Sequence, residues 1–121
     1  MVNAPEQSVT RIFHELSQPA RLQILLMLGE GEACVCHLES YLGLRQATIS
    51  QHLMALRDAG LVTTHRDGRN IYYVLSNPHL LDIVHQAAAL LDIPGKQLVP
   101  PMKPLTPCPC PHCNPGKLTC D

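Results

Sequence analysis

The sequence predicts a mainly α fold that carries a small β-hairpin. Apolar residues recur at helical spacing through most of positions 7–91, and two β-prone runs flank Asp67 and Gly68. Eight of the eleven prolines lie in the last 28 residues, where no helical period remains. A chain of 121 residues with 45% hydrophobic side chains can bury one compact core. We therefore expect one folded domain over residues 1–93 and an extended tail over residues 94–121.

Two helices are expected before residue 30. Four apolar side chains at i, i+3, i+4 and i+7 predict the first helix over about residues 7–17, namely Val9, Ile12, Phe13 and Leu16. Pro19 disfavours helix at the preceding residue but suits the first turn of a second helix. This second helix is expected to end at Gly29, and its apolar residues are Leu22, Ile24, Leu25, Leu26 and Leu28.

A tight pair of helices is expected over residues 35–61. A short helix over residues 35–42 is interrupted by Gly43, and a longer one follows over about residues 46–59. The longer helix turns Ile49, Leu53 and Leu56 inward. It leaves five polar side chains outward or on its flank, which are Gln46, Thr48, Ser50, Gln51 and His52. Short hydrogen-bonding groups without acids suit base edges and phosphates in a major groove, so this helix pair is predicted to read DNA.

A β-hairpin with a basic tip is expected next. Residues 61–63 and 71–75 are β-prone and lie on either side of Asp67 and Gly68, which are flanked by Arg66 and Arg69. A short helix, a glycine turn, a polar-faced helix and a basic hairpin follow one another in the order of a winged helix-turn-helix. By their position in this motif, the two arginines are expected to approach phosphates or the minor groove.

A last helix is expected from Asn77, a suitable cap, to about residue 91. Its apolar side chains cover more than one face, so contacts within one chain cannot bury them all. The DNA-reading region between residues 43 and 75 carries four arginines against two aspartates, a modest positive charge for binding a polyanion. Both observations predict a homodimer.

The cysteines point to an ion site or a redox sensor. Neither a membrane-spanning apolar run nor a signal-peptide pattern is present, so we expect a cytoplasmic protein, in which the six cysteines stay reduced. Cys34 and Cys36 start the short helix. In a regular helix residues two apart point about 200° from each other, so two such thiols can share an ion only where the helix begins. We also expect the helix N-terminus to lower their pKa values and favour the thiolate.

The tail supplies further thiols in Cys108, Cys110 and Cys113. Prolines between them reduce the entropy that is lost when thiolates converge on an ion. We expect Cys34 and Cys36 to combine with tail cysteines, of the same or the other subunit, in an S₃ or S₄ site. Three thiolates would suit As(III), Sb(III) or Pb(II), and four would suit Cd(II) or Zn(II). Whether His112, His37 or Cys120 takes part stays open.

Four segments closely resemble the ArsR/SmtB family of bacterial metal-sensing repressors, and the resemblance spans residues 9–92. They are LSQPARL from residue 16, QATISQHL from 46, LRDAGLV from 56 and GRNIYY from 68. The resemblance implies a homodimer whose first and last helices form the interface, bound to a palindromic operator.

The resemblance also bears on the ion site. CVCHL from residue 34 is similar to the thiolate motif of the family's arsenic and its cadmium/lead sensors. The third cysteine of the arsenic sensors is replaced here by Glu39. A second site known in the family lies on the last helix, but Asp82 and His85 do not have its spacing, so that site is not expected.

These observations predict a repressor that binds operator DNA and is released when a thiophilic ion binds its thiolates. One alternative is a redox or persulfide sensor of the same fold, whose cysteines form disulfide or polysulfide bridges. Another is a zinc-stabilised protein-interaction module without a DNA role. An enzyme is not expected, because the sequence has no nucleophile–base set and no phosphate-cradling glycine loop.

Overall fold

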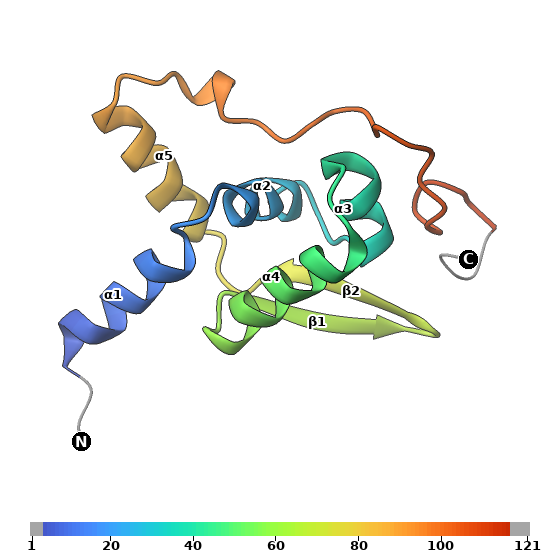
Figure 1. The fold of residues 1–121 in the computed structure, drawn as a ribbon, viewed down its shortest axis with the longest axis horizontal. Coiled ribbons are helices and arrows are strands. Elements are labelled where there is room, and N and C mark those ends of the chain that lie inside the picture. Colours follow the sequence, from blue (N-terminus) through green and yellow to red (C-terminus); the bar gives the residue numbers. More distant parts are fainter. Residues whose placement is uncertain (1–3, 117–121) are drawn as a thin grey trace.

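The computed structural model describes residues 4–116. Within them lie five α-helices, a two-stranded antiparallel hairpin and a short 3₁₀ turn (Figure 1). Their bounds are α1 Pro5–Glu15, α2 Pro19–Leu28, α3 Val35–Leu42, α4 Gln46–Asp58, β1 Val62–Asp67, β2 Asn70–Leu75, α5 Leu80–Leu90 and η1 Gly95–Gln97. The predicted mainly α fold with a small hairpin is confirmed. No helix in the described range is long and apolar enough to cross a membrane.

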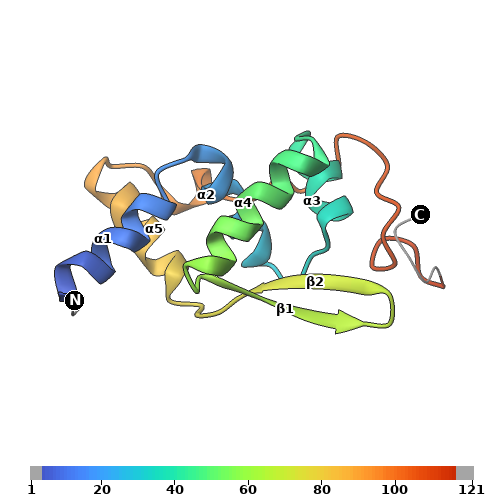
Figure 2. The same ribbon diagram turned by 60° about the horizontal axis from the view of Figure 1, so that its bottom comes forward.

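The core lies where α2, α3 and α4 meet above the hairpin (Figures 1 and 2). The three inward residues predicted for α4, Ile49, Leu53 and Leu56, are all fully buried. They pack with Leu25 of α2 and Leu38 of α3. Burying such a side chain stabilises the fold by about 1.5–3 kcal/mol. The core therefore holds the two helices of the helix-turn-helix in one rigid orientation.

The hairpin is longer than the sequence predicted. Its register runs from Val62 opposite Leu75 to Asp67 opposite Asn70, so β1 continues four residues beyond Thr63. These residues are polar and carry no β pattern, but pairing with β2 satisfies their backbone groups. Gly68 at the tip has a φ of 63°, as expected for this turn.

A segment ahead of α3 also pairs with the hairpin, which the sequence did not indicate. Ala33 and Tyr73 exchange backbone hydrogen bonds of 3.1 and 2.8 Å. The start of α3 is therefore attached to β2.

Two helices have bounds that differ from the expectation. Helix α1 begins and ends two residues earlier than predicted, since Pro5 occupies its first turn. Helix α5 begins at Leu80 rather than next to Asn77. The Asn77 side chain does accept a hydrogen bond, 2.9 Å long, from the backbone N–H of His79, but it caps the turn that precedes the helix.

The tail leaves α5 at one end of the molecule and runs back past α2 to α3 (Figure 1). The backbone N–H of Leu105 donates to the carbonyl of Ser40 over 2.8 Å, and the Ser40 hydroxyl donates to the carbonyl of Thr106. The tail is thus attached to the C-terminal half of α3, just before it reaches its cysteines.

Replacing Gly43 with alanine is expected to destabilise the fold by about 1–3 kcal/mol, more than the same change at Gly60. Both glycines have left-handed backbone, with φ of 70° and 79°. A Cβ at Gly43 would lie 2.8 Å from Cδ1 of Leu105, whereas one at Gly60 would meet nothing within 4 Å. Urea unfolding of both variants measures the difference. Equal losses would show that Leu105 does not press on this turn.

Candidate metal centre and nucleic-acid interface

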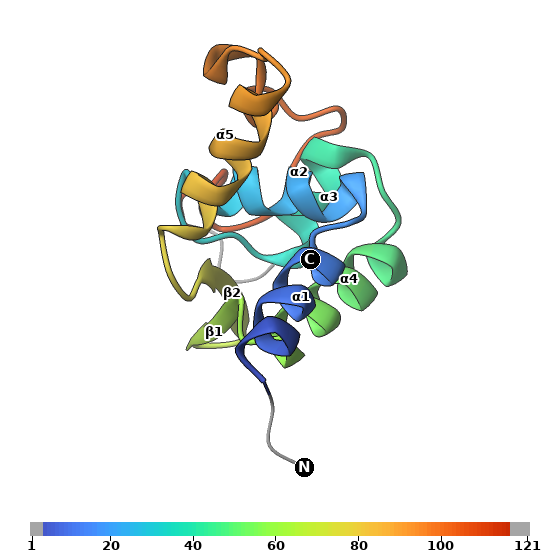
Figure 3. The same ribbon diagram turned by 90° about the vertical axis from the view of Figure 1, so that its left-hand side faces the viewer.

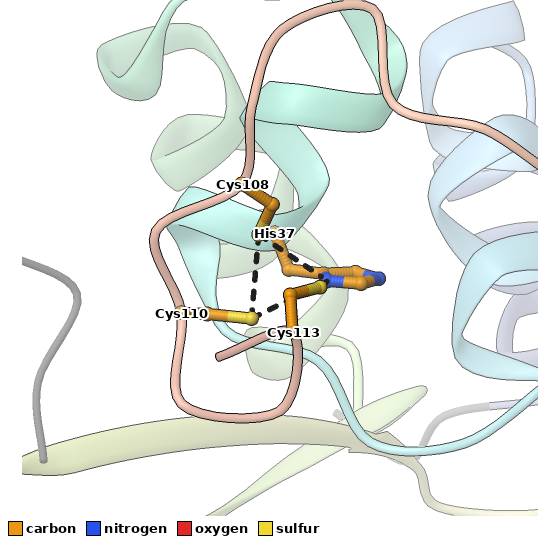
Figure 4. A group of neighbouring side chains, drawn as sticks. All are labelled: His37, Cys108, Cys110 and Cys113. Carbon is orange, nitrogen blue, oxygen red and sulfur yellow. Dashed lines mark hydrogen bonds between the residues drawn. The ribbon is translucent and has the colours of Figure 1, made fainter. Parts of the chain in front are cut away.

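Four side chains converge at the start of α3 (Figure 4). The sulfur atoms of Cys108, Cys110 and Cys113 lie 3.6, 3.5 and 3.4 Å from Nδ1 of His37. All four ligand atoms lie within 4.8 Å of one another. Soft and borderline ions such as Cd(II) and Zn(II) favour this donor set of three thiols and one imidazole.

The loop that carries the three cysteines is held by its own backbone. The N–H groups of Cys113 and Asn114 donate to the carbonyl of Cys110 over 3.1 and 3.0 Å. The Asn114 amide also donates to the carbonyls of Cys108 and Cys110, at 2.7 and 3.0 Å. The sulfur atoms therefore face one another before any ion arrives, which lowers the entropy cost of binding one.

The His37 ring is oriented by Tyr41, one turn further along α3. Their ring centroids lie 4.4 Å apart, with the planes inclined by 28°. Burial lowers the pKa of His37, and the nearby His112 adds to the effect. The imidazole is thus neutral at neutral pH, the form in which a ring nitrogen binds a metal.

The predicted pair Cys34 and Cys36 lies beside this cluster. Cys34 is the N-cap of α3, in extended backbone, and its sulfur lies 3.1 Å from that of Cys36. The irregular start of the helix does bring the two sulfurs together. Cys34 is also buried in one apolar cluster with Cys108, Cys110 and Tyr72.

The expected lowering of the thiol pKa at the helix start is wrong for Cys34. Burial raises the pKa of the Cys34 thiol to about 11, and the backbone N–H of His37 lowers it by less. Burial likewise raises the pKa of Cys108 to about 12. Burial works in the same direction at Cys110, but hydrogen bonds from Cys108 and from backbone N–H groups outweigh it and lower the pKa. Cys110 is therefore the first thiol of the cluster to ionise.

The side chains predicted to read DNA differ in their exposure. Gln46 and Gln51 on α4 are exposed, and so are Arg66 and Arg69 on the hairpin, while Thr48 and Ser50 are half-buried. Figure 2 shows the hairpin extending beyond α4 toward the end of the molecule that holds α3 and the tail loop.

His52 has a second contact within the chain. The Arg21 guanidinium donates to its Nδ1 over 3.1 Å and is itself paired with Glu15 at 2.6 Å. Burial and the charge of Arg21 lower the pKa of His52. The ring therefore stays neutral, with Nδ1 as the acceptor.

The sequence pattern of the bacterial regulatory protein, arsR family, matches residues 18–64, which span α2, the helix pair and the first half of β1. The biofilm growth-associated repressor of Agrobacterium fabrum is 36% identical over 90 residues, covering 74% of this chain and 77% of that protein. The chain belongs to the ArsR family. The resemblance inferred from the four sequence segments is confirmed.

Two further relatives are named for resistance to arsenicals or to cadmium. The arsenical resistance operon repressor of Staphylococcus xylosus is 39% identical, over 71% of this chain and 82% of its own length. The cadmium resistance transcriptional regulatory protein CadC of Listeria innocua is 34% identical, over 69% of this chain and 71% of its own length.

A solved structure described as a homodimeric winged helix-turn-helix DNA-binding domain, from Mycobacterium bovis, has a TM-score of 0.63. It is 28% identical and is matched over 76% of this chain and 91% of its own length. The winged helix-turn-helix assignment is thereby confirmed. Membership of a family of DNA-binding regulators also favours the repressor over the zinc-stabilised module.

In this ArsR-family chain the tail cysteines converge on a residue other than those favoured by the sequence. The tail cysteines meet His37, to which the sequence gave no priority, and they lie beside the favoured pair Cys34 and Cys36. The sequence feature that could have identified His37 as a ligand is its position, directly after Cys36 in the first turn of α3. His112 turns instead toward Glu32, with its Nε2 3.2 Å from the carboxylate. Cys120 lies outside the described residues.

The two helices that the family resemblance assigns to the dimer interface expose apolar side chains. Within α1 no residue is buried, and Phe13 is 58% exposed. Leu90 and Leu91 at the end of α5 are 86% and 72% exposed. Both helices lie at the end of the molecule opposite the cysteine loop (Figure 1), the end that faces the viewer in Figure 3.

Proposed function

We propose that this protein is a transcriptional repressor that binds operator DNA as a homodimer and is released by a thiophilic ion. The proposal rests mainly on one observation. Three tail sulfurs converge on Nδ1 of His37, which lies in the first helix of the helix-turn-helix. The same helix pair would then both read DNA and receive the ion signal.

The geometry of the cluster supports an ion as its occupant. With metal–sulfur bonds of about 2.3 Å and metal–nitrogen bonds of about 2.0–2.1 Å, a tetrahedral site separates sulfur from nitrogen by roughly 3.6 Å. The three distances of 3.4–3.6 Å around His37 match this spacing. Three sulfurs and one nitrogen in this arrangement favour Cd(II) or Zn(II) over As(III) or Pb(II), which prefer three thiolates.

Cys34 completes the proposed ligand environment, and Cys36, which is disulfide-bonded, would join it only once reduced. Cys34 interacts with Cys110 and is buried against it, so a thiolate from the helix start lies within reach of the tail sulfurs. An ion supplies positive charge that stabilises several thiolates at once, which the raised pKa of Cys34 would otherwise oppose. A three-sulfur site that includes Cys34 is the arrangement we expect for As(III).

Exposed and half-buried polar side chains support the DNA-reading role. We assign base and phosphate contacts to the outward face of α4, and backbone contacts to the hairpin arginines. These residues are Gln46, Thr48, Ser50, Gln51, His52, Arg66 and Arg69. His52 would make its contact through Nε2, because Nδ1 already accepts from Arg21.

The apolar surfaces of α1 and α5 support the homodimer. Phe13, Leu16, Ile83, Ala87 and Leu91 line a groove between the first, second and last helices. A second copy that inserts its own α1 and α5 would cover these side chains. It would also place two reading helices about one DNA turn apart, at about 34–36 Å.

The test is a fluorescence-anisotropy titration of the metal-free protein with a duplex that it selects from a random-sequence library. We expect Cd(II) to weaken DNA binding about 5- to 150-fold, the usual range of allosteric coupling. Pb(II), Zn(II) and As(III) are titrated in parallel to rank the ions. An affinity unchanged by all four would overturn the proposal.

A redox sensor is the second candidate, and the 3.1 Å between the Cys34 and Cys36 sulfurs favours it. Because Cys36 is disulfide-bonded, the neighbouring Cys34 sulfur needs little movement to exchange with that disulfide. Mass spectrometry of the oxidised protein, together with its DNA affinity, separates the two candidates. A redox sensor releases DNA on oxidation in the presence of a metal chelator.

A further inference from the structure

The loop that carries Cys108, Cys110 and Cys113, here called the tail loop, contacts α3 and also the β1–β2 hairpin. This hairpin is the wing of the fold. Glu32, which precedes α3, uses both carboxylate oxygens. Oε2 lies 3.0 Å from Nδ1 of His65 on β1, and Oε1 lies 3.2 Å from Nε2 of His112 in the tail. A neutral imidazole can donate from either ring nitrogen, so these contacts do not require charged histidines.

Tyr72 of β2 also packs between the tail loop and the hairpin. Its ring is 2% exposed and lies in one buried cluster with Cys108 and Cys110. The His112 ring meets it edge-on, with centroids 4.7 Å apart and planes at 77°, and the His65 ring lies at 5.6 Å. His65 and Tyr72 are cross-strand partners in the hairpin.

His112 lies in the loop between Cys110 and Cys113. Any displacement of these sulfurs toward a shared ion must therefore move His112, because only one or two peptide units separate them. The other end of the contact is His65, which precedes the exposed Arg66 in β1. Ala33, next to Glu32, is paired with Tyr73, so the carboxylate is held between α3 and the hairpin.

We propose that Glu32, His65 and His112 form a tail–wing clasp that transmits ion binding to the hairpin. This inference rests on the proposed function, because it takes the cysteine cluster as the ion site. The three residues are positioning residues, since none belongs to the group of converging ligand atoms. Ion binding fixes the position of the tail loop and therefore of His112. Through Glu32 and His65, the clasp then restrains β1 and changes how the hairpin contacts DNA.

The test compares Glu32→Ala with Glu30→Ala. Glu30 is an exposed acid two residues earlier, so its removal gives the same charge change away from the clasp. Cd(II) binding is followed by the thiolate-to-metal absorption band, and hydrogen exchange of residues 62–75 by mass spectrometry. In the wild type and in Glu30→Ala we expect Cd(II) to slow exchange in this segment by about threefold or more. In Glu32→Ala we expect Cd(II) binding within about tenfold of the wild type and no slowing.

His112→Phe is the second variant, because it keeps an aromatic ring against Tyr72 but has no N–H for Glu32. It should bind Cd(II) and lose the slowing of exchange in the same way. DNA release by Cd(II) should fall to less than about twofold in both clasp variants.

The possible outcomes distinguish the clasp from the proposed function. Slowing that persists in Glu32→Ala, or a wild type that binds Cd(II) without any slowing, overturns the clasp. Glu32-dependent slowing without any change in DNA affinity supports the clasp and overturns the repressor mechanism. A wild type that does not bind Cd(II) overturns both.

Discussion

Replacing Cys110 with serine is expected to lower the affinity for Cd(II) at least about 100-fold and to abolish ion-dependent release of DNA. Structural zinc sites contribute about 10–16 kcal/mol over four ligands, so one thiolate accounts for roughly 3 kcal/mol. Cys110 is fully buried, has a lowered pKa and accepts the hydrogen bond of Cys108 over 3.3 Å. Loss of the thiolate-to-metal absorption band measures the effect.

Two controls separate ligand loss from misfolding. The metal-free Cys110→Ser protein should melt within a few degrees of the wild type and bind DNA equally well, because the helix pair has its own core. The exposed Cys113, changed to serine, should also weaken Cd(II) binding, since its sulfur is the closest to Nδ1 of His37. Cd(II) binding of wild-type strength in both variants would exclude the tail from the site.

Changing Gln51 to glutamate is expected to weaken DNA binding about 30- to 10⁴-fold without affecting the ion site. A lost base or phosphate contact costs about 1–3 kcal/mol, and a homodimer would lose two of them. The exposed side chain lies on the outward face of α4, where a carboxylate would also meet the charge of the phosphates. Anisotropy with the selected duplex, at one stated salt concentration, measures the loss.

Gln97→Glu is the matched control for this change. Gln97 is an exposed glutamine in η1, outside the helix pair and the hairpin, so the variant alters the net charge equally. It should bind DNA within about twofold of the wild type. Equal losses in the two variants would mean that net charge, rather than the face of α4, controls binding. Cd(II) titration of Gln51→Glu should match the wild type.

Local patterns were sufficient to predict the helix pair. Ile49, Leu53 and Leu56 recur at helical spacing, and all three are fully buried. Gly43 ends α3 in left-handed backbone as expected, and Gly68 forms the hairpin turn. These features depend on the backbone geometry of a few consecutive residues, which a short stretch of sequence contains in full.

The sequence indicated the thiols of the proposed ion site but not the imidazole that joins them. The sequence indicated that tail thiols would meet the start of α3, but His37 and Cys108 are 71 residues apart in the chain. No periodicity connects positions so distant. The rise in the pKa of Cys34 has the same origin, because the tail and Tyr72 bury a thiol that the helix start alone would have favoured as thiolate.

The sequence by itself thus determined the fold class, and it predicted a DNA-reading face on α4 and a thiophilic ion for the thiols. Only the tertiary structure decided which imidazole joins the sulfurs, which cysteine ionises first and how Glu32 connects the tail to the hairpin. Secondary structure follows from interactions between neighbouring residues. Ligand geometry, burial and the tail–wing contact arise from packing between segments that are brought together only when the whole chain folds.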